Sequence, residues 1–425
     1  MELLIVGAGK VGYFLAKALN KNHNVTIIDK NEKALEKIIE NLDVLTVNKD
    51  IRDPNISHYL NDYYDYLINV TNNDEINIIS DLILKNKLEI KHSVIRLGNT
   101  DYVNSPLYKI LNARLIFPYI LSARGIARLM DFPKANNIKT IPFCEFSLVS
   151  ITADTTVNVS EINSENVLVI GVERDEKFIF LKEKDFIIQN DLVYIIGDLE
   201  KIKQLAYKIN QNSPDRLEKI TIFGANDLAI TIAKLLNEFD IKIKIVEKEE
   251  DVAKKAADIL PENIEIIHMA YEDDEILINE GVHHSDAAIT AYLHDEDNII
   301  KSLKARKLGI KKIITINNNL NYYSIMHSLK LSTIRGPKIA AFYEILEEID
   351  SQFLIYERFF LGMQGKIFIK KVFKAKKIEK PKEYAKVIVI RNDKIFEVKD
   401  TFEVKEDDII VEFNFSGNRS WIEEL

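Results

Sequence analysis

The hydrophobic positions of the first part of the chain alternate between two patterns. Continuous apolar runs, typical of strands buried in a parallel sheet, occur at residues 3–6, 25–28, 44–47, 66–70, 92–97 and 115–117. Apolar residues at helical spacing lie between these runs and predict helices after residue 12 and near 31–41, 54–61 and 74–86. Strands and helices that alternate in this way predict a parallel sheet with helices on both faces.

The pattern of apolar residues changes after about residue 140, and the first pattern begins again near residue 220. Short β-like runs at 146–151, 167–170, 177–180 and 192–196 follow one another with few helical breaks, which predicts a small β-rich domain. A second strand, helix and strand then appear at 220–223, near 228–238 and at 243–246. The second pattern repeats the first one in type and order.

Matching residues in the two halves of the chain are separated by nearly the same number of positions. Asp74 and its neighbours match Asp295 and its neighbours at an offset of 221, and Arg174 matches Arg391 at 217. Asp191 is matched to Asp407 at an offset of 216. Two unrelated domains of one common fold are the alternative, but separated landmarks at nearly one offset favour a tandem duplication of a two-domain unit.

The fold class is therefore predicted to be α/β, with tandem Rossmann-like doubly wound parallel sheets. Each of these domains is followed by a small β-rich α+β subdomain. The expected limits are 1–122 and 217–335 for the two Rossmann-like domains and 138–212 and 352–425 for the two subdomains.

The first glycine motif occurs in the context that a dinucleotide site requires. Gly7, Gly9 and Gly12 follow a buried strand and open a helix, and Asp29 closes the next strand. Gly7 permits a tight turn, Gly9 lets the backbone approach a pyrophosphate, and Gly12 lets the helix pack close to the strand. Asp29 can accept hydrogen bonds from ribose hydroxyls and would repel a 2′-phosphate, which favours NAD(H) or an adenine nucleotide over NADP(H). The alternative is a degenerate fold that kept its glycines for turns.

The second copy departs from this motif. Asn226 replaces the middle glycine, and its Cβ is expected where the backbone must approach the phosphates. Ala229 at the third glycine position is tolerable, and Glu247 keeps an acid at the end of the next strand. A structural or dimer-forming role is therefore favoured over nucleotide binding in this copy.

Composition narrows the functional classes. The chain of 425 residues has 57 Lys and Arg against 66 Asp and Glu, and this net charge of −9 argues against a nucleic-acid partner. Its one cysteine, Cys144, excludes a disulfide framework within one chain and favours a reducing compartment. No apolar run approaches the roughly 18 residues that span a bilayer, and the start lacks the features of a signal peptide. We expect a cytoplasmic protein that reaches membranes only through a partner.

Other candidate sites have ordinary structural explanations. The adjacent His283 and His284 would point apart on a strand, the acids at 272–275 suit a solvated helix start, and the lysines between 366 and 386 suit a solvated face. Cys144 has no arranged histidine and is interpreted as a small apolar residue. No metal site and no catalytic residue is predicted.

The motifs together resemble the TrkA family, the cytoplasmic regulatory subunits of Trk-type potassium uptake systems with tandem RCK/KTN units (RCK_N and RCK_C). The resemblance covers nearly the whole chain. It is carried by the glycine turn at 7–12, by Asp29, by Val70-Thr71-Asn72-Asn73-Asp74-Glu75-x-Asn77, and by Ile95-Arg96 before Asp101-Tyr102-Val103. Lys49-Asp50 stands where the family usually has Gly-Asp, and 291–294 departs further in the second copy.

The resemblance implies a function and a set of contacts. It implies a non-enzymatic nucleotide sensor that gates a separate membrane potassium transporter subunit (TrkH-, TrkG- or KtrB-like), as a homo-oligomer on the inner face of the plasma membrane. NAD(H) is the first choice of ligand, with ATP or ADP as alternatives. The implied nucleotide contacts are Gly7, Ala8, Gly9, Lys10, Val11, Gly12, Asp29, Thr71, Asn72 and Arg96. The alternatives are an NAD-dependent dehydrogenase, for which the β-rich segment offers no convincing proton donor, and a structural scaffold with dead sites.

Overall fold

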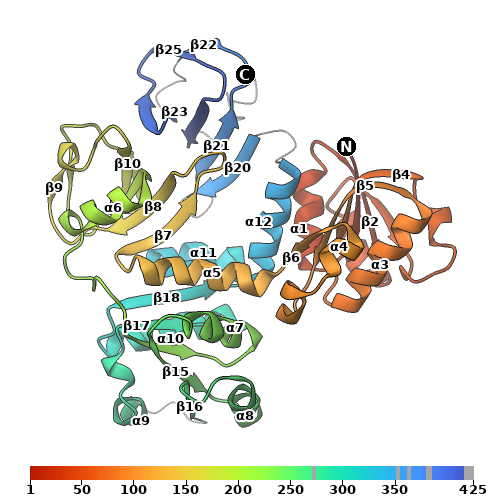
Figure 1. Ribbon diagram of the computed structural model, residues 1–425, viewed down its shortest axis with the longest axis horizontal. Coiled ribbons are helices and arrows are strands. Elements are labelled where there is room, and N and C mark those ends of the chain that lie inside the picture. The colour runs from red at the N-terminus through yellow and green to blue at the C-terminus, as the bar shows by residue number, and fades with distance from the viewer. Residues whose placement is uncertain (270–273, 351–354, 361–364, 380–384, 416–425) are drawn as a thin grey trace. The chain divides into compact units, whose positions relative to one another are not determined.

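The chain forms two compact units, each described here by itself. The computed structural model describes residues 1–269, 274–350, 355–360, 365–379 and 385–415. Unit 1 combines Met1–Ala123 with Arg335–Glu348, and unit 2 combines Arg124–Ile334 with Ile349–Leu425 (Figure 1). The predicted domain limits remain predictions, and parts of the last predicted domain, at 352–354, 361–364, 380–384 and 416–425, lie outside the described residues.

Unit 1 is built on a six-stranded parallel sheet. The strand order is β3-β2-β1-β4-β5-β6, so the order reverses between β1 and β4. The strands are β1 (Glu2–Val6), β2 (Asn24–Asp29), β3 (Leu45–Asn48), β4 (Tyr63–Asn69), β5 (Glu89–Arg96) and β6 (Arg114–Ile116). The helices are α1 (Lys10–Leu19), α2 (Glu32–Ile39), α3 (Asp74–Lys87) and α4 (Leu107–Leu111). This is the doubly wound sheet that the apolar runs predict.

One predicted helix of unit 1 is wrong. Where a helix was expected near 54–61, the chain forms a single turn of 3₁₀ helix at Ile56–Tyr59. The Asp53 carboxylate accepts a hydrogen bond from the Asn55 N–H at 2.8 Å, and Leu60 is already extended. Short polar side chains compete with helix formation by bonding the local backbone in this way, so the segment stays a turn.

A helix from the second half of the sequence completes unit 1. Helix α12 (Pro337–Asp350) follows the second sheet in sequence, yet residues 335–348 cluster with the first sheet. Its Phe342 ring meets Phe14 of α1 edge to face with centroids 6.1 Å apart, and Glu344 pairs with Arg114 at 3.3 Å. In Figure 1 the blue α12 accordingly lies beside the red α1.

Unit 2 contains a second parallel sheet and both small β-rich sheets. Its parallel sheet has the order β16-β15-β14-β17-β18-β19, which matches unit 1 strand for strand. The strands are β14 (Lys219–Phe223), β15 (Lys242–Glu247), β16 (Glu265–His268), β17 (Ala287–Thr290), β18 (Lys312–Asn317) and β19 (Ser332–Arg335). The helices are α7 (Asp227–Leu236), α8 (Glu250–Ile259), α9 (Asp274–Asn279), α10 (Asp295–Lys307) and α11 (Tyr323–Ser328).

The two β-rich segments are also copies of one another. The first, after α5 (Pro118–Asp131) and before α6 (Leu199–Leu205), forms the sheet β11-β10-β13-β8-β7 with a side ribbon of β9 and β12. Its strands are β7 (Ala135–Thr140), β8 (Ser147–Thr152), β9 (Val157–Asn158), β10 (Val167–Arg174), β11 (Lys177–Phe180), β12 (Phe186–Ile187) and β13 (Leu192–Gly197). The second forms β20-β21-β26-β23-β24 with a ribbon of β22 and β25. Its strands are β20 (Ile355–Phe360), β21 (Gly365–Lys371), β22 (Lys376–Glu379), β23 (Ala385–Arg391), β24 (Lys394–Glu397), β25 (Thr401–Val404) and β26 (Ile409–Asn414).

The two small sheets share one hydrophobic core within unit 2. Buried residues of the first sheet, such as Leu148 and Ile196, belong to the same cluster as Ile388 and Val411 of the second. Such a shared core arises because a sheet with one apolar face must bury that face against another layer.

An arginine–aspartate pair recurs in both small sheets. Arg174 contacts both carboxylate oxygens of Asp191, at 2.8 and 2.7 Å, and Arg391 contacts Asp408 in the same way, at 2.8 and 2.6 Å. The counterpart of Asp191 is therefore Asp408, and the sequence match to Asp407 is wrong by one position. The offset of 217 holds for both members of the pair.

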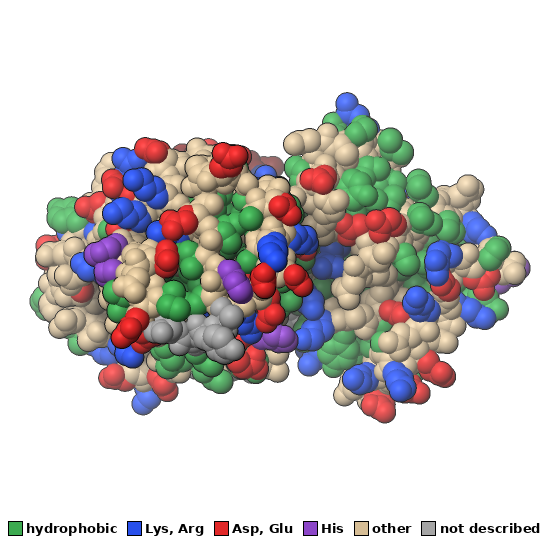
Figure 2. All heavy atoms as spheres, turned by 90° about the horizontal axis from the view of Figure 1, so that it is seen from below, with side chains coloured by type: hydrophobic (Ala, Val, Ile, Leu, Met, Phe, Trp, Pro, Cys, Tyr) green, Lys and Arg blue, Asp and Glu red, His purple; other side chains and the backbone are tan. Residues whose placement is uncertain are grey.

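The surface shows mixed charge. On the face in Figure 2, Asp and Glu side chains are interspersed with Lys and Arg. This face does not offer the extended basic surface that neutralises nucleic-acid phosphates. No helix in the described part of the chain has the length and apolar character needed to cross a membrane.

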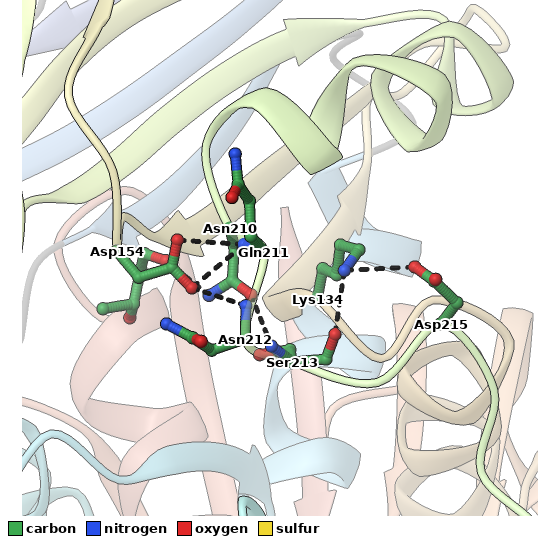
Figure 3. Close-up of polar contacts among 8 residues, drawn as sticks. Lys134, Asp154, Asn210, Gln211, Asn212, Ser213 and Asp215 are labelled. Carbon is green, nitrogen blue, oxygen red and sulfur yellow. Dashed lines mark hydrogen bonds and ion pairs between the residues drawn. The ribbon is translucent and has the colours of Figure 1, made fainter.

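The segment that leads from the first small domain to the second parallel sheet is held by two charged side chains (Figure 3). The half-buried Asp154 carboxylate accepts hydrogen bonds from the N–H groups of Gln211 and Asn212, at 2.9 and 2.7 Å. The buried Lys134 ammonium donates to the Ser213 carbonyl at 2.8 Å and pairs with Asp215 at 3.1 Å. The backbone of this connector is thus bonded although it belongs to no helix or strand.

We predict that Asp154→Ala destabilises unit 2. The substitution removes a charged acceptor from two backbone N–H groups, which should lower the free energy of unfolding by about 2 kcal/mol. Chemical denaturation of the full chain measures this change. The matched control is Asp258→Ala, at an exposed position of α8, which should change stability by less than about 0.5 kcal/mol. Equal effects of the two substitutions would contradict the role given to Asp154.

A lysine is buried at the start of β18. Lys312 is 6% exposed, and its ammonium nitrogen donates to the Ala135 carbonyl oxygen of β7. It forms no ion pair with a carboxylate of the described residues. Burial lowers the pKa of Lys312 to about 7, because the charged form loses its hydration.

This burial predicts a pH-dependent stability. Between pH 7 and about 10 the unfolded chain carries a proton on Lys312 that the folded chain has released, so stability should rise with pH in this window. The linkage amounts to about 2.5 kcal/mol between pH 7.5 and 9.5, from about 1.36 kcal/mol per pH unit. Lys312→Met should remove this rise, which denaturation of both proteins across the window measures. A parental slope that persists in Lys312→Met would assign the dependence to another group.

Candidate nucleotide-binding site

Two of the three glycines of the first motif are required by the fold itself. Gly7 has φ of +109°, and a Cβ there would lie 3.0 Å from the Thr71 backbone nitrogen. A Cβ on Gly12 would lie 1.9 Å from the Gly7 carbonyl oxygen, a distance that real structures do not tolerate. These glycines therefore permit the turn and the close approach of α1 to β1, as the motif predicts.

The middle glycine faces open space. A Cβ on Gly9 would meet no atom within 4 Å, and the φ of −70° is accessible to any residue. Gly9 is the N-cap of α1, and no side chain caps this helix or places an acid in its first turn. No side chain therefore caps the N–H groups of the first turn, and together with the helix dipole they form an arrangement that favours an anion. Nothing in the fold itself requires glycine at this position.

The second repeat fills the same place with a side chain. Asn226 caps α7, and its carbonyl oxygen accepts from the N–H groups of Leu228 at 3.0 Å and Ala229 at 3.1 Å. Its amide nitrogen donates to the Ala291 carbonyl at 2.6 Å. Beyond the Cβ expected from the sequence, the whole amide of Asn226 is bonded to the donors that a phosphate would use.

The acids that end the second strands differ in accessibility. The half-buried Asp29 accepts from the Ala8 N–H at 2.7 Å and the Asn31 N–H at 2.8 Å, which leaves lone pairs on both oxygens. Glu247 makes the corresponding bond to the Ala225 N–H at 2.7 Å but is only 4% exposed. Each acid therefore stabilises the glycine turn of its repeat by accepting a backbone hydrogen bond. Of the two, only the Asp29 carboxylate is accessible to solvent.

The remaining predicted residues follow β4 and end β5. The Arg96 guanidinium donates to the Thr71 carbonyl at 2.9 Å and lies 3.5 Å from the Asn72 side-chain oxygen. The Arg96 Nε is buried without a hydrogen-bond partner, and burial is the main cause that lowers the pKa of Arg96. A buried guanidinium that keeps an unused donor is a natural contact for an anionic group.

Asn77 positions this edge of the sheet and is not among the ten site residues expected from the sequence. Its side chain accepts from the Thr71 N–H at 2.9 Å and donates to the Thr71 and Arg96 carbonyls at 3.1 and 2.8 Å. Asn298 makes the corresponding bonds to Tyr292 and Ile316 in the second repeat. Asn77 recurs as Asn298 at the offset of 221, and this recurrence could have identified it from the sequence.

All ten predicted residues lie in unit 1, near the carboxyl ends of its strands. Direct contacts join Ala8 to Asp29 and Arg96 to Thr71 and Asn72. Lys10 is exposed at the first position of α1, whereas the Val11 side chain is 5% exposed and points into the core, so that only its backbone is available. The ten residues are Gly7, Ala8, Gly9, Lys10, Val11, Gly12, Asp29, Thr71, Asn72 and Arg96.

The other sequence candidates do not form a second site. His283 and His284 lie on a 3₁₀ turn rather than a strand, with ring centroids 3.7 Å apart, and no group of three potential metal ligands occurs among the described residues. Of the acids at 272–275, the first two lie outside the described residues, and Asp274 pairs with Lys304 at 2.9 Å. Burial raises the pKa of the Cys144 thiol, which disfavours the nucleophilic thiolate. Of the lysines at 366–386, those at 380 and 382 lie outside the described residues, and Lys386 is only 6% exposed, so the interpretation as a solvated face is wrong for it.

Known proteins of similar sequence are potassium uptake proteins. The chain is 27% identical over 360 residues to the Trk system potassium uptake protein TrkA homolog of Archaeoglobus fulgidus, covering 81% of this chain and 80% of that protein. It is 24% identical to the Trk system potassium uptake protein TrkA homolog 2 of Methanosarcina mazei, with full coverage of both chains.

Solved structures of similar fold are the GsuK channel bound to NAD and the GsuK RCK domain. The first has a TM-score of 0.61 at 14% identity, over 98% of this chain and 77% of that chain. The second has a TM-score of 0.59 at 15% identity, over 98% of this chain and 92% of that chain. A family profile described as the TrkA-N domain matches residues 3–117 and 220–337, once in each repeat and together more than half of the chain. The chain therefore belongs to the TrkA-N domain family.

Proposed function

We propose that this chain is a nucleotide-binding regulatory subunit of a Trk-type potassium uptake system and gates a separate membrane transporter. The observation that carries the proposal is the open, uncapped start of α1 at Gly9, beside a second repeat in which Asn226 caps the corresponding helix. The names of the relatives support a role in potassium uptake. The similar GsuK structures, one bound to NAD and one bound to ADP, support NAD(H) or an adenine nucleotide as the ligand.

Each predicted residue has a role in this proposal. The N–H groups at the start of α1 would bind the phosphates, with Gly9 leaving the backbone accessible and Lys10 adding positive charge. Asp29 would accept hydrogen bonds from ribose hydroxyls with its remaining lone pairs. Arg96, held by the Thr71 carbonyl, would contribute its unused donor. Thr71 and Asn72 would border the ligand at the carboxyl edge of the sheet.

The proposed gating is a linkage between two equilibria. A nucleotide that binds one arrangement of the chain better than another shifts the protein toward that arrangement, and a bound transporter responds to the shift. A coupling free energy of about 1–3 kcal/mol is ordinary for such systems. The protein would act on the inner face of the plasma membrane through its partner, as a homo-oligomer, and the nucleotide would be released chemically unchanged.

We predict that Gly9→Asn strongly weakens nucleotide binding without unfolding the protein. A Cβ at this position has space, and the new amide can cap α1 as Asn226 caps α7, so thermal stability should be kept or raised. The amide would compete with the phosphates, and affinity for NAD or ADP should fall more than about tenfold, or about 1.4 kcal/mol. Calorimetric titration measures the affinity.

The matched control changes the cap of the second repeat. Asn226→Ala should leave the nucleotide affinity of the chain as it is and lower the free energy of unfolding by about 1 kcal/mol, because it removes the cap of α7. If Asn226→Ala impaired binding more than Gly9→Asn, the ligand would belong to the second repeat.

The gating itself is tested by potassium flux through liposomes that contain the membrane transporter. With this protein bound, flux should depend on NAD(H) or on adenine nucleotides, and the Gly9→Asn protein should bind the transporter but lose that dependence. Identical flux in every condition, despite demonstrated binding to the transporter, would refute the proposal. Sustained oxidation of NADH in the presence of a small carbonyl compound would instead indicate a dehydrogenase.

A further inference from the structure

Helix α12 comes from the second repeat but lies against the candidate site of the first. Residues 335–348 belong to unit 1, and Phe342 of α12 contacts Phe14 of α1 edge to face, with ring centroids 6.1 Å apart. Each phenylalanine follows a lysine by four positions, Lys10 on α1 and Lys338 on α12. Residues four apart lie on the same face of a helix, so each lysine lies on the face of its helix that carries the contacting ring.

Three cationic side chains meet in this region, and the Asp74 carboxylate acts on one of them, Arg96. Lys10 and Arg96 both act on Lys338 and, together with partial burial, lower the pKa of the Lys338 ammonium. None of the three forms an ion pair with a described carboxylate. The nearby Asp74 uses its two oxygens to accept from the Gly98 and Asn99 N–H groups, at 2.8 and 2.7 Å. Like charges held close together cost free energy, and an anion bound between them would offset that cost.

The three cations come from separate elements of the fold. Lys10 begins α1, Arg96 ends β5, and Lys338 lies in the first turn of α12. The open first turn of α1 adds uncapped backbone donors at the same place. Four features of the site therefore favour negative charge, and one of them is supplied by the other repeat.

We infer that Lys338 binds the phosphates of the nucleotide held at the glycine turn of the first repeat, so that the second repeat supplies part of the first repeat's site. The recognised chemistry is the diphosphate that NAD(H), ADP and ATP share. This inference rests on the proposed nucleotide binding and adds a residue that the glycine motif does not include. A nucleotide bound in the first repeat would also stabilise the position of a helix of the second repeat, because the ligand would contact both α1 and α12.

The test is calorimetric titration of the full chain with ADP and with NAD, for the parent, Lys338→Gln and Lys338→Arg. Lys338→Gln should weaken binding of both nucleotides by about tenfold, and Lys338→Arg should restore it to within about threefold, since the charge is kept. The matched control is Lys17→Gln, which removes the same charge from an exposed position near the end of α1 and should leave affinity unchanged. The affinity of the parent should also fall more steeply with added salt than that of Lys338→Gln.

A second measurement separates binding from a structural role. Without ligand, Lys338→Gln should melt at the parental temperature or above it, because the substitution relieves repulsion with Lys10 and Arg96. With ADP, its thermal midpoint should rise less than that of the parent. A ligand-free Lys338→Gln protein that melts below the parent, together with weak binding that Lys338→Arg does not restore, would assign Lys338 a structural role and overturn the inference.

The remaining outcomes distinguish this inference from the function on which it rests. If the parent binds ADP or NAD and Lys338→Gln binds them equally well, Lys338 is not part of the site, and the proposed nucleotide binding stands. If the parent binds neither nucleotide, both the proposed function and the role of Lys338 are refuted.

Discussion

The backbone N–H groups at the start of the helix after the first strand need acceptors, and the two repeats meet this need differently. In the second repeat the Asn226 amide bonds them, so the turn is complete without a ligand. In the first repeat Gly9 provides no side chain, and no other side chain caps these donors. A glycine N-cap in place of a capping side chain costs roughly a few tenths of a kcal/mol of stability. That cost is consistent with a site kept open for an anion that supplies the missing acceptors when it binds.

The scaffold around this difference is nearly the same in both repeats. Asn77 and Asn298 join the ends of neighbouring strands by the same bonds, and Asp29 and Glu247 each brace the turn that follows the first strand. The sheets also share one strand order. Because these hydrogen bonds are equivalent, the two repeats differ mainly in two features. One is whether a side chain caps the helix, and the other is whether the acid at the end of the second strand is accessible to solvent. The second repeat keeps the fold although a side chain caps its helix.

Packing contacts join the two repeats at two places, an arrangement that suits a regulatory protein. The two small sheets bury their apolar faces in one core within unit 2, and α12 of the second repeat packs on α1 of the first within unit 1. A ligand at the glycine turn therefore acts beside a contact between the repeats. Linkage requires only that the ligand binds better when that contact is in place, and it needs no chemical step.

The sequence alone determined the alternating elements, the duplication and the open glycine turn, because these depend on residue order and local spacing. It placed Gly7, Gly9, Gly12 and Asp29 correctly around one turn, but it did not predict the turn at 56–59, the Asp408 partner of Arg391, or the role of Asn77. The tertiary structure decided what depends on contacts distant in sequence. The amide of Asn226 reaches the Ala291 carbonyl, and α12 brings Lys338 to Lys10 and Arg96 from more than 200 residues away. No local pattern encodes such contacts, since the packing of whole elements creates them.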